Sequence, residues 1–142
     1  MDSFKKIAAA ASIVILTGCA SGLNSIQDRE YAAWKNDGVL VVEKDPALGV
    51  ALGFLPGGGS FYAREPGYGI LNLLLWPASI LWDPISGLEG AKVINYDVTK
   101  SSLKRAKNEE LTRLEDELTL GNIDSTEYVL KKRSIDQKYS YD

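Results

Sequence analysis

Apolar residues fall into three stretches of this 142-residue chain, and each stretch has its own pattern. A short apolar run at residues 7–16 follows two lysines near the N-terminus. Two longer arms, residues 46–55 and 67–82, are free of charged side chains, and a periodic apolar stripe runs through the charged C-terminal part. These patterns predict a mainly α-helical fold with little or no sheet, in which a short apolar helical hairpin precedes a charged helix-turn-helix hairpin.

The two central arms are too short to cross a bilayer as straight helices. They would be about 15 and 24 Å long, whereas the hydrocarbon core of a membrane is roughly 30 Å thick. Pro77 removes a backbone donor within the second arm and predicts a kink there. The spacing of Gly49 and Gly53 would let the two arms approach closely. The hairpin is expected either to enter one leaflet of a membrane or to form a compact core, and the pattern leaves both open.

A glycine-rich segment, "LPGGGSFY", joins the two arms. Three glycines before a serine suit a loop that cradles phosphate, but the Gly-Lys-Ser/Thr ending of a P-loop is missing. We therefore expect the glycines to reverse the chain and the aromatic residues that follow to lie at the lip of the turn, against lipid or against protein. The residues assigned to this turn are Gly57, Gly58, Gly59, Phe61 and Tyr62.

Local helix signals precede the hairpin. The sequence "SIQDREYAAWKNDG" predicts a short helix that begins near Ser25 and ends before Gly38. Residues 39–44 are expected to be extended chain. Asp45 followed by Pro46 predicts the start of a helix in the first apolar arm.

The C-terminal part of the chain is strongly charged. Gly87 and Gly90 are expected to weaken any helix that precedes it. A leucine stripe then predicts a helix that ends at Gly121, and Asp124 with Glu127 predicts the capped start of a second helix. The residues expected to form an interaction surface on these two helices are Leu114, Leu118, Tyr128 and Ile135.

The N-terminus has the features of an export signal, with two lysines, an apolar run and small residues before the only cysteine. The 11 residues of the run, 7–17, would reach about 16 Å as a helix and are too short to span a membrane. The sequence "LTGC", formed by Leu16, Thr17, Gly18 and Cys19, resembles the lipobox of bacterial lipoproteins. The resemblance implies cleavage before Cys19 and its acylation, so that acyl chains hold the mature protein in membrane lipid.

The net charge of the mature chain bears on which partners it can bind. Removing residues 1–18 takes away two of the 16 basic and one of the 19 acidic side chains, which leaves a net charge of −4. An acidic chain is not drawn to nucleic acid by its overall field, so no nucleic-acid partner is expected. Ala20 rather than aspartate follows the cysteine. Similarity to enterobacterial sorting signals then implies the periplasmic side of the outer membrane, with the inner membrane less favoured.

Two further resemblances concern the mature chain. Residues 111–136, "LTRLEDELTLGNIDSTEYVLKKRSID", resemble the SHOCT motif, a C-terminal helical hairpin that implies association with a protein partner or with a second copy. Residues 52–83 resemble small two-helix membrane hairpins with a glycine-rich turn. As a whole, the chain resembles small lipoproteins of Gram-negative bacteria and of their phages and prophages, which implies a location and no activity.

These features divide the chain into four parts. Residues 1–18 are the lipoprotein signal peptide, and residues 19–44 are the lipidated N-terminus with its short helix. Residues 45–98 form the hydrophobic hairpin region, and residues 99–142 form the charged SHOCT-like hairpin. Partners are therefore expected at two places, membrane lipid at Cys19 and protein at the C-terminal helices.

The chain offers little for catalysis. It contains no histidine, which removes the commonest general base and most zinc sites. Ser60 has no candidate base near it in the sequence, and the carboxylates at residues 115–117 are consecutive and would point in different directions on a helix. We expect no cofactor, no metal and no enzymatic activity. The favoured function is an envelope scaffold or interaction protein; the alternative is superinfection exclusion by a phage or prophage lipoprotein, and an envelope hydrolase is less favoured.

Overall fold

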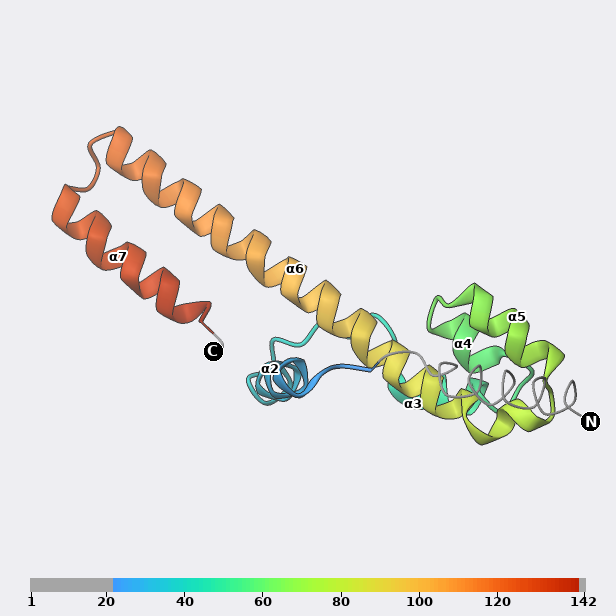
Figure 1. Cartoon of the computed structure of the whole chain (residues 1–142). Coiled ribbons are helices and arrows are strands. Elements are labelled where there is room, and N and C mark those ends of the chain that lie inside the picture. The colour runs from blue at the N-terminus through green and yellow to red at the C-terminus, as the bar shows by residue number, and fades with distance from the viewer. Residues whose placement is uncertain (1–21, 141–142) are drawn as a thin grey trace, which may run out of the picture. The chain divides into compact units, whose positions relative to one another are not determined.

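The computed structural model describes residues 22–140, and these residues form six α-helices, one 3-10 helix and no strand. The elements, in chain order (Figure 1), are α2 (Ser25–Asn36), α3 (Pro46–Leu52), α4 (Gly58–Tyr62), α5 (Pro66–Leu74), the 3-10 helix η1 (Ala78–Leu81), α6 (Asp83–Thr119) and α7 (Ser125–Lys138). The predicted mainly α-helical fold is confirmed. In this part of the chain, no helix combines the length and the apolar character that a membrane crossing requires.

The described residues fall into two compact units. The hairpin unit consists of residues 22–24 and 42–95, and the tail unit consists of residues 25–41 and 96–140. Helix α6 contributes its first turns, from Asp83, to the hairpin unit and its remaining turns, from Tyr96, to the tail unit. Helix α2 therefore belongs to the same unit as the C-terminal helices, although the hairpin lies between them in the sequence.

The first helix of the hairpin unit begins where the sequence predicts. Asp45 caps α3 by accepting a hydrogen bond from the Ala47 amide at 2.8 Å, and Pro46 occupies the first turn. Residues 39–44, which precede this cap, contain neither helix nor strand. The expectation of extended chain stays a prediction, and the chain bends at Glu43 and Lys44.

The turn between the two arms is more regular than the sequence predicts. Gly57 has a φ of 70°, a value that favours glycine, and it reverses the chain. Gly58 and Gly59 do not extend the turn but begin the five-residue helix α4. The break expected at Pro77 is present, because α5 ends at Leu74 and a separate 3-10 helix follows.

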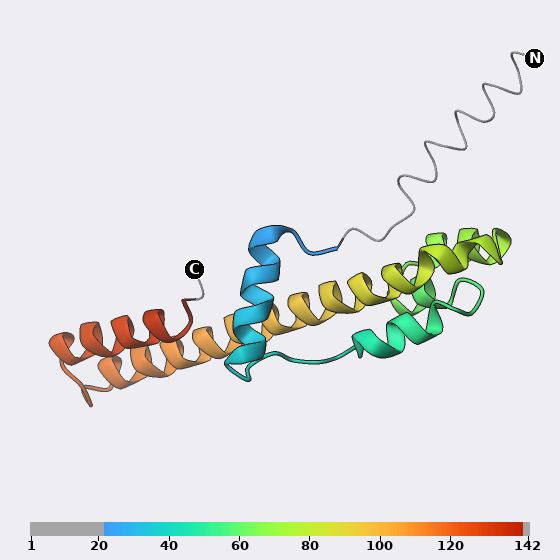
Figure 2. The same cartoon turned by 90° about the horizontal axis from the view of Figure 1, so that it is seen from below.

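Glycines bring the backbones of α3 and α6 into contact. A Cβ added at Gly49 would lie 2.4 Å from the carbonyl oxygen of Gly87, and one added at Gly53 would lie 2.3 Å from the Cα of Pro84. The sequence suggested that Gly49 and Gly53 join the two apolar arms, but both lie against the start of α6 instead. In Figures 1 and 2, α3 accordingly lies beside the first turns of α6.

Helix α6 is continuous over its 37 residues, so the weakening expected at Gly87 and Gly90 does not occur. A Cβ added at Gly87 would lie 2.2 Å from the carbonyl oxygen of Gly49, and one added at Gly90 would lie 2.2 Å from the Cβ of Ala63. A glycine costs a helix about 1 kcal/mol relative to alanine. Here the close packing that only glycine allows outweighs this cost.

Two contacts organise the tail unit. Trp34 of α2 stacks on Tyr96 of α6, with ring centroids 5.0 Å apart.

Before α7, Gly121 has a φ of 73°, and Asp124 caps the helix by accepting a hydrogen bond from the Glu127 amide at 2.8 Å. The capping predicted from the sequence is confirmed. In both views α7 then runs alongside the last part of α6 (Figures 1 and 2).

Candidate functional site

Large apolar side chains cover the outside of the hairpin unit. Between residues 46 and 85, eleven of them are exposed, from 42% at Leu75 to 80% at Leu81. They are Leu48, Phe54, Leu55, Phe61, Ile70, Leu73, Leu74, Leu75, Trp76, Leu81 and Ile85. An apolar surface of this extent is rare on a soluble monomer and is typical of contact with lipid or with another protein.

The interior of the same unit is polar. The polar side chains that are at most 1% exposed belong to Ser60, Asn72, Ser79, Asp83, Ser86 and Asn95. Among the described residues of this unit, the buried apolar side chains are the small ones of Ala63 and Ala91. Most proteins bury aliphatic groups and expose polar ones. The hairpin unit therefore shows the reverse distribution.

Asp83 is the centre of this polar interior. Its carboxylate is fully buried and accepts hydrogen bonds from the Gly59 amide at 3.0 Å and from the Ser60 amide and hydroxyl at 3.0 and 2.6 Å. The Asn72 side-chain amide donates a fourth hydrogen bond at 2.8 Å, and its oxygen accepts one from the Trp82 indole at 2.9 Å. Four donors thus satisfy a carboxylate that would otherwise be costly to bury.

The glycine-rich turn therefore binds a carboxylate of the chain itself. The amides of Gly59 and Ser60 are the kind of donors that a phosphate loop would use, and Asp83 engages both. A Cβ added at Gly59 would lie 2.2 Å from the carbonyl oxygen of Asp83, so no larger residue fits there. These two amides have no capacity left for a phosphate group.

The two aromatic residues assigned to the turn have different surroundings. Phe61 is 45% exposed, and its ring lies against Gly69 of α5, where an added Cβ would come within 2.6 Å of it. Tyr62 is half-buried, and its hydroxyl accepts a hydrogen bond from the Asp45 amide at 2.9 Å. Phe61 therefore belongs to the apolar exterior, whereas Tyr62 joins a group of polar side chains.

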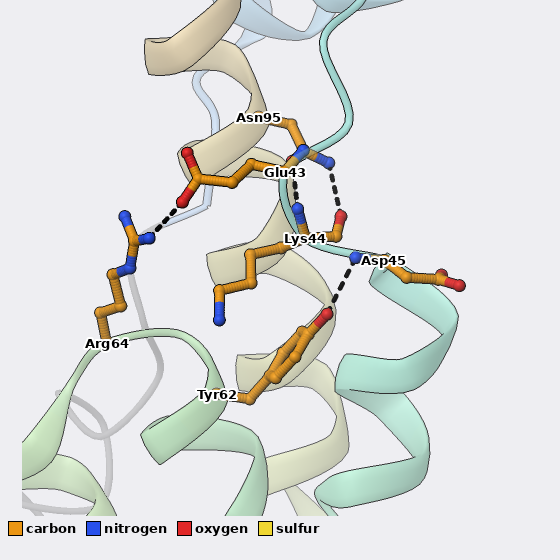
Figure 3. A network of polar contacts seen from close by, with 6 residues as sticks. All are labelled: Glu43, Lys44, Asp45, Tyr62, Arg64 and Asn95. Carbon is orange, nitrogen blue, oxygen red and sulfur yellow. Dashed lines mark hydrogen bonds and ion pairs between the residues drawn. The ribbon is translucent and has the colours of Figure 1, made fainter.

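Polar side chains gather around the start of α3 and the end of α4 (Figure 3). Asn95 is fully buried there; it accepts hydrogen bonds from the Glu43 and Lys44 amides at 2.9 and 2.8 Å and donates one to the Lys44 carbonyl at 2.7 Å. Arg64 pairs with Glu43, and the Lys44 ammonium lies 4.5 Å from the centre of the Tyr62 ring. The group is termed the polar collar and consists of Glu43, Lys44, Asp45, Tyr62, Arg64 and Asn95.

Beyond the polar collar and the exposed Glu65, which directly follows Arg64 at the start of α5, the apolar exterior carries no exposed charge among the described residues. Asp83 is the only charged residue from residue 66 to residue 88, and it is buried. The first arm, residues 46–55, contains none. The next charges along α6, Glu89 and Lys92, form an ion pair at 2.9 Å. The hairpin unit therefore has a charged end and an uncharged end.

The polar interior presents no reactive group to solvent. The Ser60 hydroxyl donates to Asp83, accepts a hydrogen bond from Asn72 at 2.9 Å and is 1% exposed. Within residues 22–140, no group of three or more histidine, cysteine or carboxylate side chains is placed to hold a metal ion. What the hairpin unit offers to its surroundings is aliphatic and aromatic surface with a charged rim.

The four residues predicted to form an interaction surface in the tail lie where α6 and α7 meet. Leu114 is buried, and the other three, Leu118, Tyr128 and Ile135, are half-buried. Three ion pairs join the same helices: Lys107 with Asp136 at 2.8 Å, Lys131 with Glu117 at 3.3 Å, and Lys138 with Glu110 at 2.5 Å. The exposed large apolar side chains of α7 are Val129 and Leu130, and Leu120 is exposed in the turn that precedes it. Association through the tail stays a prediction.

A second buried polar group lies in the tail unit. Tyr96 is 2% exposed; its hydroxyl donates to Glu30 and accepts a hydrogen bond from Lys100 at 2.9 Å. Burial and the Glu30 carboxylate raise the pKa of Tyr96, and the hydrogen bond to Tyr96 raises the pKa of Lys100. Both groups therefore keep their protons at neutral pH.

The sequence pattern alone does not indicate Asn72, Asp83 or Asn95 as site residues. Asn72 and Asp83 are isolated polar side chains within or directly after a long apolar run. Most buried polar side chains are hydrogen-bonded, so the position of these two residues in the sequence already indicated that they have hydrogen-bond partners. The partners remained unknown because they lie far away in the sequence.

The lipobox residues Leu16, Thr17, Gly18 and Cys19 lie outside the described residues, so lipidation stays a prediction.

No protein-family model, curated protein or solved structure matches this chain.

Proposed function

We propose that the protein is a non-enzymatic envelope lipoprotein that acylated Cys19 holds at the periplasmic side of the outer membrane, and that its hairpin unit enters the adjacent leaflet. In this proposal the tail unit stays in water and binds a protein partner or a second copy. The observation that carries the proposal is the reverse distribution of side chains in the hairpin unit, which is apolar outside and polar inside.

The uncharged end of the hairpin unit has the depth of one leaflet. Helix α5 has nine residues and is about 14 Å long. Along α6, six residues separate Asp83 from Glu89, which is about 9 Å. One leaflet contributes about 15 Å of hydrocarbon. The unit therefore fits one leaflet with the polar collar among the headgroups, where lysine and arginine side chains are favoured.

Transfer into hydrocarbon would stabilise this arrangement strongly. Complete burial of one large apolar side chain is worth about 1.5–3 kcal/mol. The eleven exposed side chains are on average about half exposed, so each would contribute about 1 kcal/mol. Their sum, roughly 10 kcal/mol, is large compared with the 5–15 kcal/mol that typically stabilise a whole domain.

The N-terminal end of the hairpin unit supports the same arrangement. A Cβ added at Gly22 would lie 2.6 Å from the Glu89 carboxylate, so Gly22 lies beside α6 near its first exposed charges. Cys19 precedes Gly22 by three residues, which span at most about 11 Å. Acyl chains on Cys19 would therefore enter the membrane close to the hairpin unit.

Flotation with lipid vesicles tests this proposal. A mature chain with Cys19→Ser lacks the acyl anchor, and we expect it to float with phosphatidylethanolamine–phosphatidylglycerol vesicles through its hairpin unit. Leu74→Gln with Leu81→Gln should lower its partition coefficient at least about tenfold, because both leucines would be buried in lipid. The matched control, Leu120→Gln with Leu130→Gln, changes similarly exposed leucines of the tail unit and should bind as before. An unanchored chain that stays in the aqueous fraction, or equal losses in both double variants, would contradict the proposal.

A further inference from the structure

A pocket in the tail unit lies where α2, α6 and the end of α7 meet. Its volume is about 290 Å³, near the lower end of the range found for small-molecule sites. Its lining combines an apolar part, Trp34, Leu103 and Tyr139, with a cationic part, Lys100, Lys104 and Lys107. The combination of aromatic rings and ammonium groups in one pocket is unlike the rest of the tail surface.

Most of the charged groups around the pocket are already engaged. The three lysines follow one face of α6 at positions i, i+4 and i+7. Lys100 donates to the Tyr96 hydroxyl at 2.9 Å, and Lys107 pairs with Asp136 at 2.8 Å. Glu30, the one acid of the lining, accepts a hydrogen bond from the Tyr96 hydroxyl.

Lys104 differs from its two neighbours. Among the described residues it forms no ion pair. The residues one turn away on α6 are Lys100, Ser101, Lys107 and Asn108, none of them an acid. Like charges at this spacing destabilise a helix, and a bound anion would remove that repulsion. An acidic group at Lys104 would therefore meet a cation that has no competing partner in the described chain.

The apolar part of the lining is held in place before any ligand binds. Trp34 is 3% exposed, and its ring stacks on Tyr96. Tyr139 is fixed by the hydrogen bond that its hydroxyl donates to Glu110 at 2.8 Å. A preorganised wall lowers the entropic cost of binding a rigid, flat group.

From this juxtaposition we propose that the pocket binds a small organic anion, with its acidic group at Lys104 and a flat apolar body against Leu103 and Tyr139, next to Trp34. A carboxylate, a sulfonate or a phosphate ester carries the required charge. This binding function concerns the tail unit and does not depend on the membrane insertion proposed for the hairpin unit.

The probe for this proposal is 2-naphthoate. The full mature chain is labelled with 5-fluorotryptophan and placed in lipid nanodiscs, and its three tryptophan signals are assigned by single Trp→Phe replacements. In fluorine NMR the Trp34 signal reports the pocket, whereas the signals of Trp76 and Trp82 report ligand that binds at the hairpin unit instead. We expect a saturable shift of the Trp34 signal. Naphthalene-2-carboxamide, which lacks the charge, and acetate, which lacks the apolar body, should each bind at least about fivefold more weakly.

Variants of α6 make the test specific. Lys104→Gln should weaken naphthoate binding at least about fivefold, and Lys104→Arg should retain it. Arg105→Gln removes the same charge one residue away, where the side chain lines a different surface, and should bind as the wild-type chain does. An unchanged Trp34 signal in the ligand-free variants shows that the pocket is intact. The proposal is overturned by a Trp34 signal that does not saturate, by equal affinity for the carboxamide, or by unchanged binding in Lys104→Gln.

Discussion

Asp83→Asn perturbs the buried polar network with the smallest change of shape. In the wild-type chain, Oδ2 of the carboxylate accepts from the Gly59 amide, and Oδ1 accepts from Ser60 and Asn72. Asparagine keeps one oxygen and replaces the other with an NH₂ group. If the oxygen stays toward Ser60 and Asn72, the NH₂ group faces the Gly59 amide, and two donors meet where a hydrogen bond of 3.0 Å had been.

The destabilisation expected for Asp83→Asn follows from the lost hydrogen bond of the Gly59 amide. A hydrogen bond to a charged group is worth about 1.5–3 kcal/mol, and a buried donor left without an acceptor costs a further 1–3 kcal/mol or so. Asparagine has no charge to desolvate, which offsets part of this loss. We expect a net destabilisation of about 3 kcal/mol, which corresponds to roughly a 150-fold increase in the opening equilibrium of α4.

Amide hydrogen exchange of the membrane-bound chain measures this opening directly. Exchange at Gly59 and Ser60 should become about 150-fold faster in Asp83→Asn. Asp97→Asn makes the same chemical change at an exposed position of α6 and should leave both amides protected. If the exchange rate at Gly59 rises less than about threefold, or rises equally in Asp97→Asn, Asp83 does not hold α4 in place.

Three further outcomes are expected. Gly87→Ala should destabilise the hairpin unit by about 1–3 kcal/mol in thermal unfolding followed by circular dichroism, because its Cβ would lie 2.2 Å from the backbone of α3; Gly67→Ala, which would meet nothing within 4 Å, is the control. Acidification should loosen the contact between α6 and α7, because the hydrogen bond from Lys138 lowers the pKa of Glu110 below its ordinary value of 4.5. The stability that Glu110 contributes is complete above that value and is lost as the pH falls through the lowered pKa, so a circular dichroism titration of Glu110→Gln should show a smaller loss. Metabolic labelling with a palmitate analogue should disappear in Cys19→Ser, and persistent labelling would exclude Cys19 as the acylated residue.

Helix ends that depend on neighbouring residues were predictable from the sequence. The caps at Asp45 and Asp124 each form within three or four consecutive residues, so the sequence contains everything that decides them. The same holds for the positive φ of Gly38 and Gly121, which follow the helices that they end.

Features that depend on distant contacts were not predictable in this way. Helix propensity alone predicts that Gly87 destabilises a helix. In the structure, Gly87 instead allows α6 to contact the backbone of α3, which the propensity does not take into account. Asp83 stands directly after an apolar run in the sequence, but its donors at Gly59 and Ser60 come from more than 20 residues earlier. The division between exterior and interior follows from these contacts, which explains why the sequence left lipid contact and core packing open.

The buried carboxylate would also affect membrane insertion, if the hairpin unit enters lipid as proposed. In the proposed arrangement, a chain in which α4 has not formed would carry Asp83 into hydrocarbon without its amide donors. An unsatisfied aspartate at that depth costs about 3 kcal/mol or more. In the proposed arrangement, such a chain would be held at the bilayer surface until its short helices had assembled. Insertion would thereby select correctly folded copies.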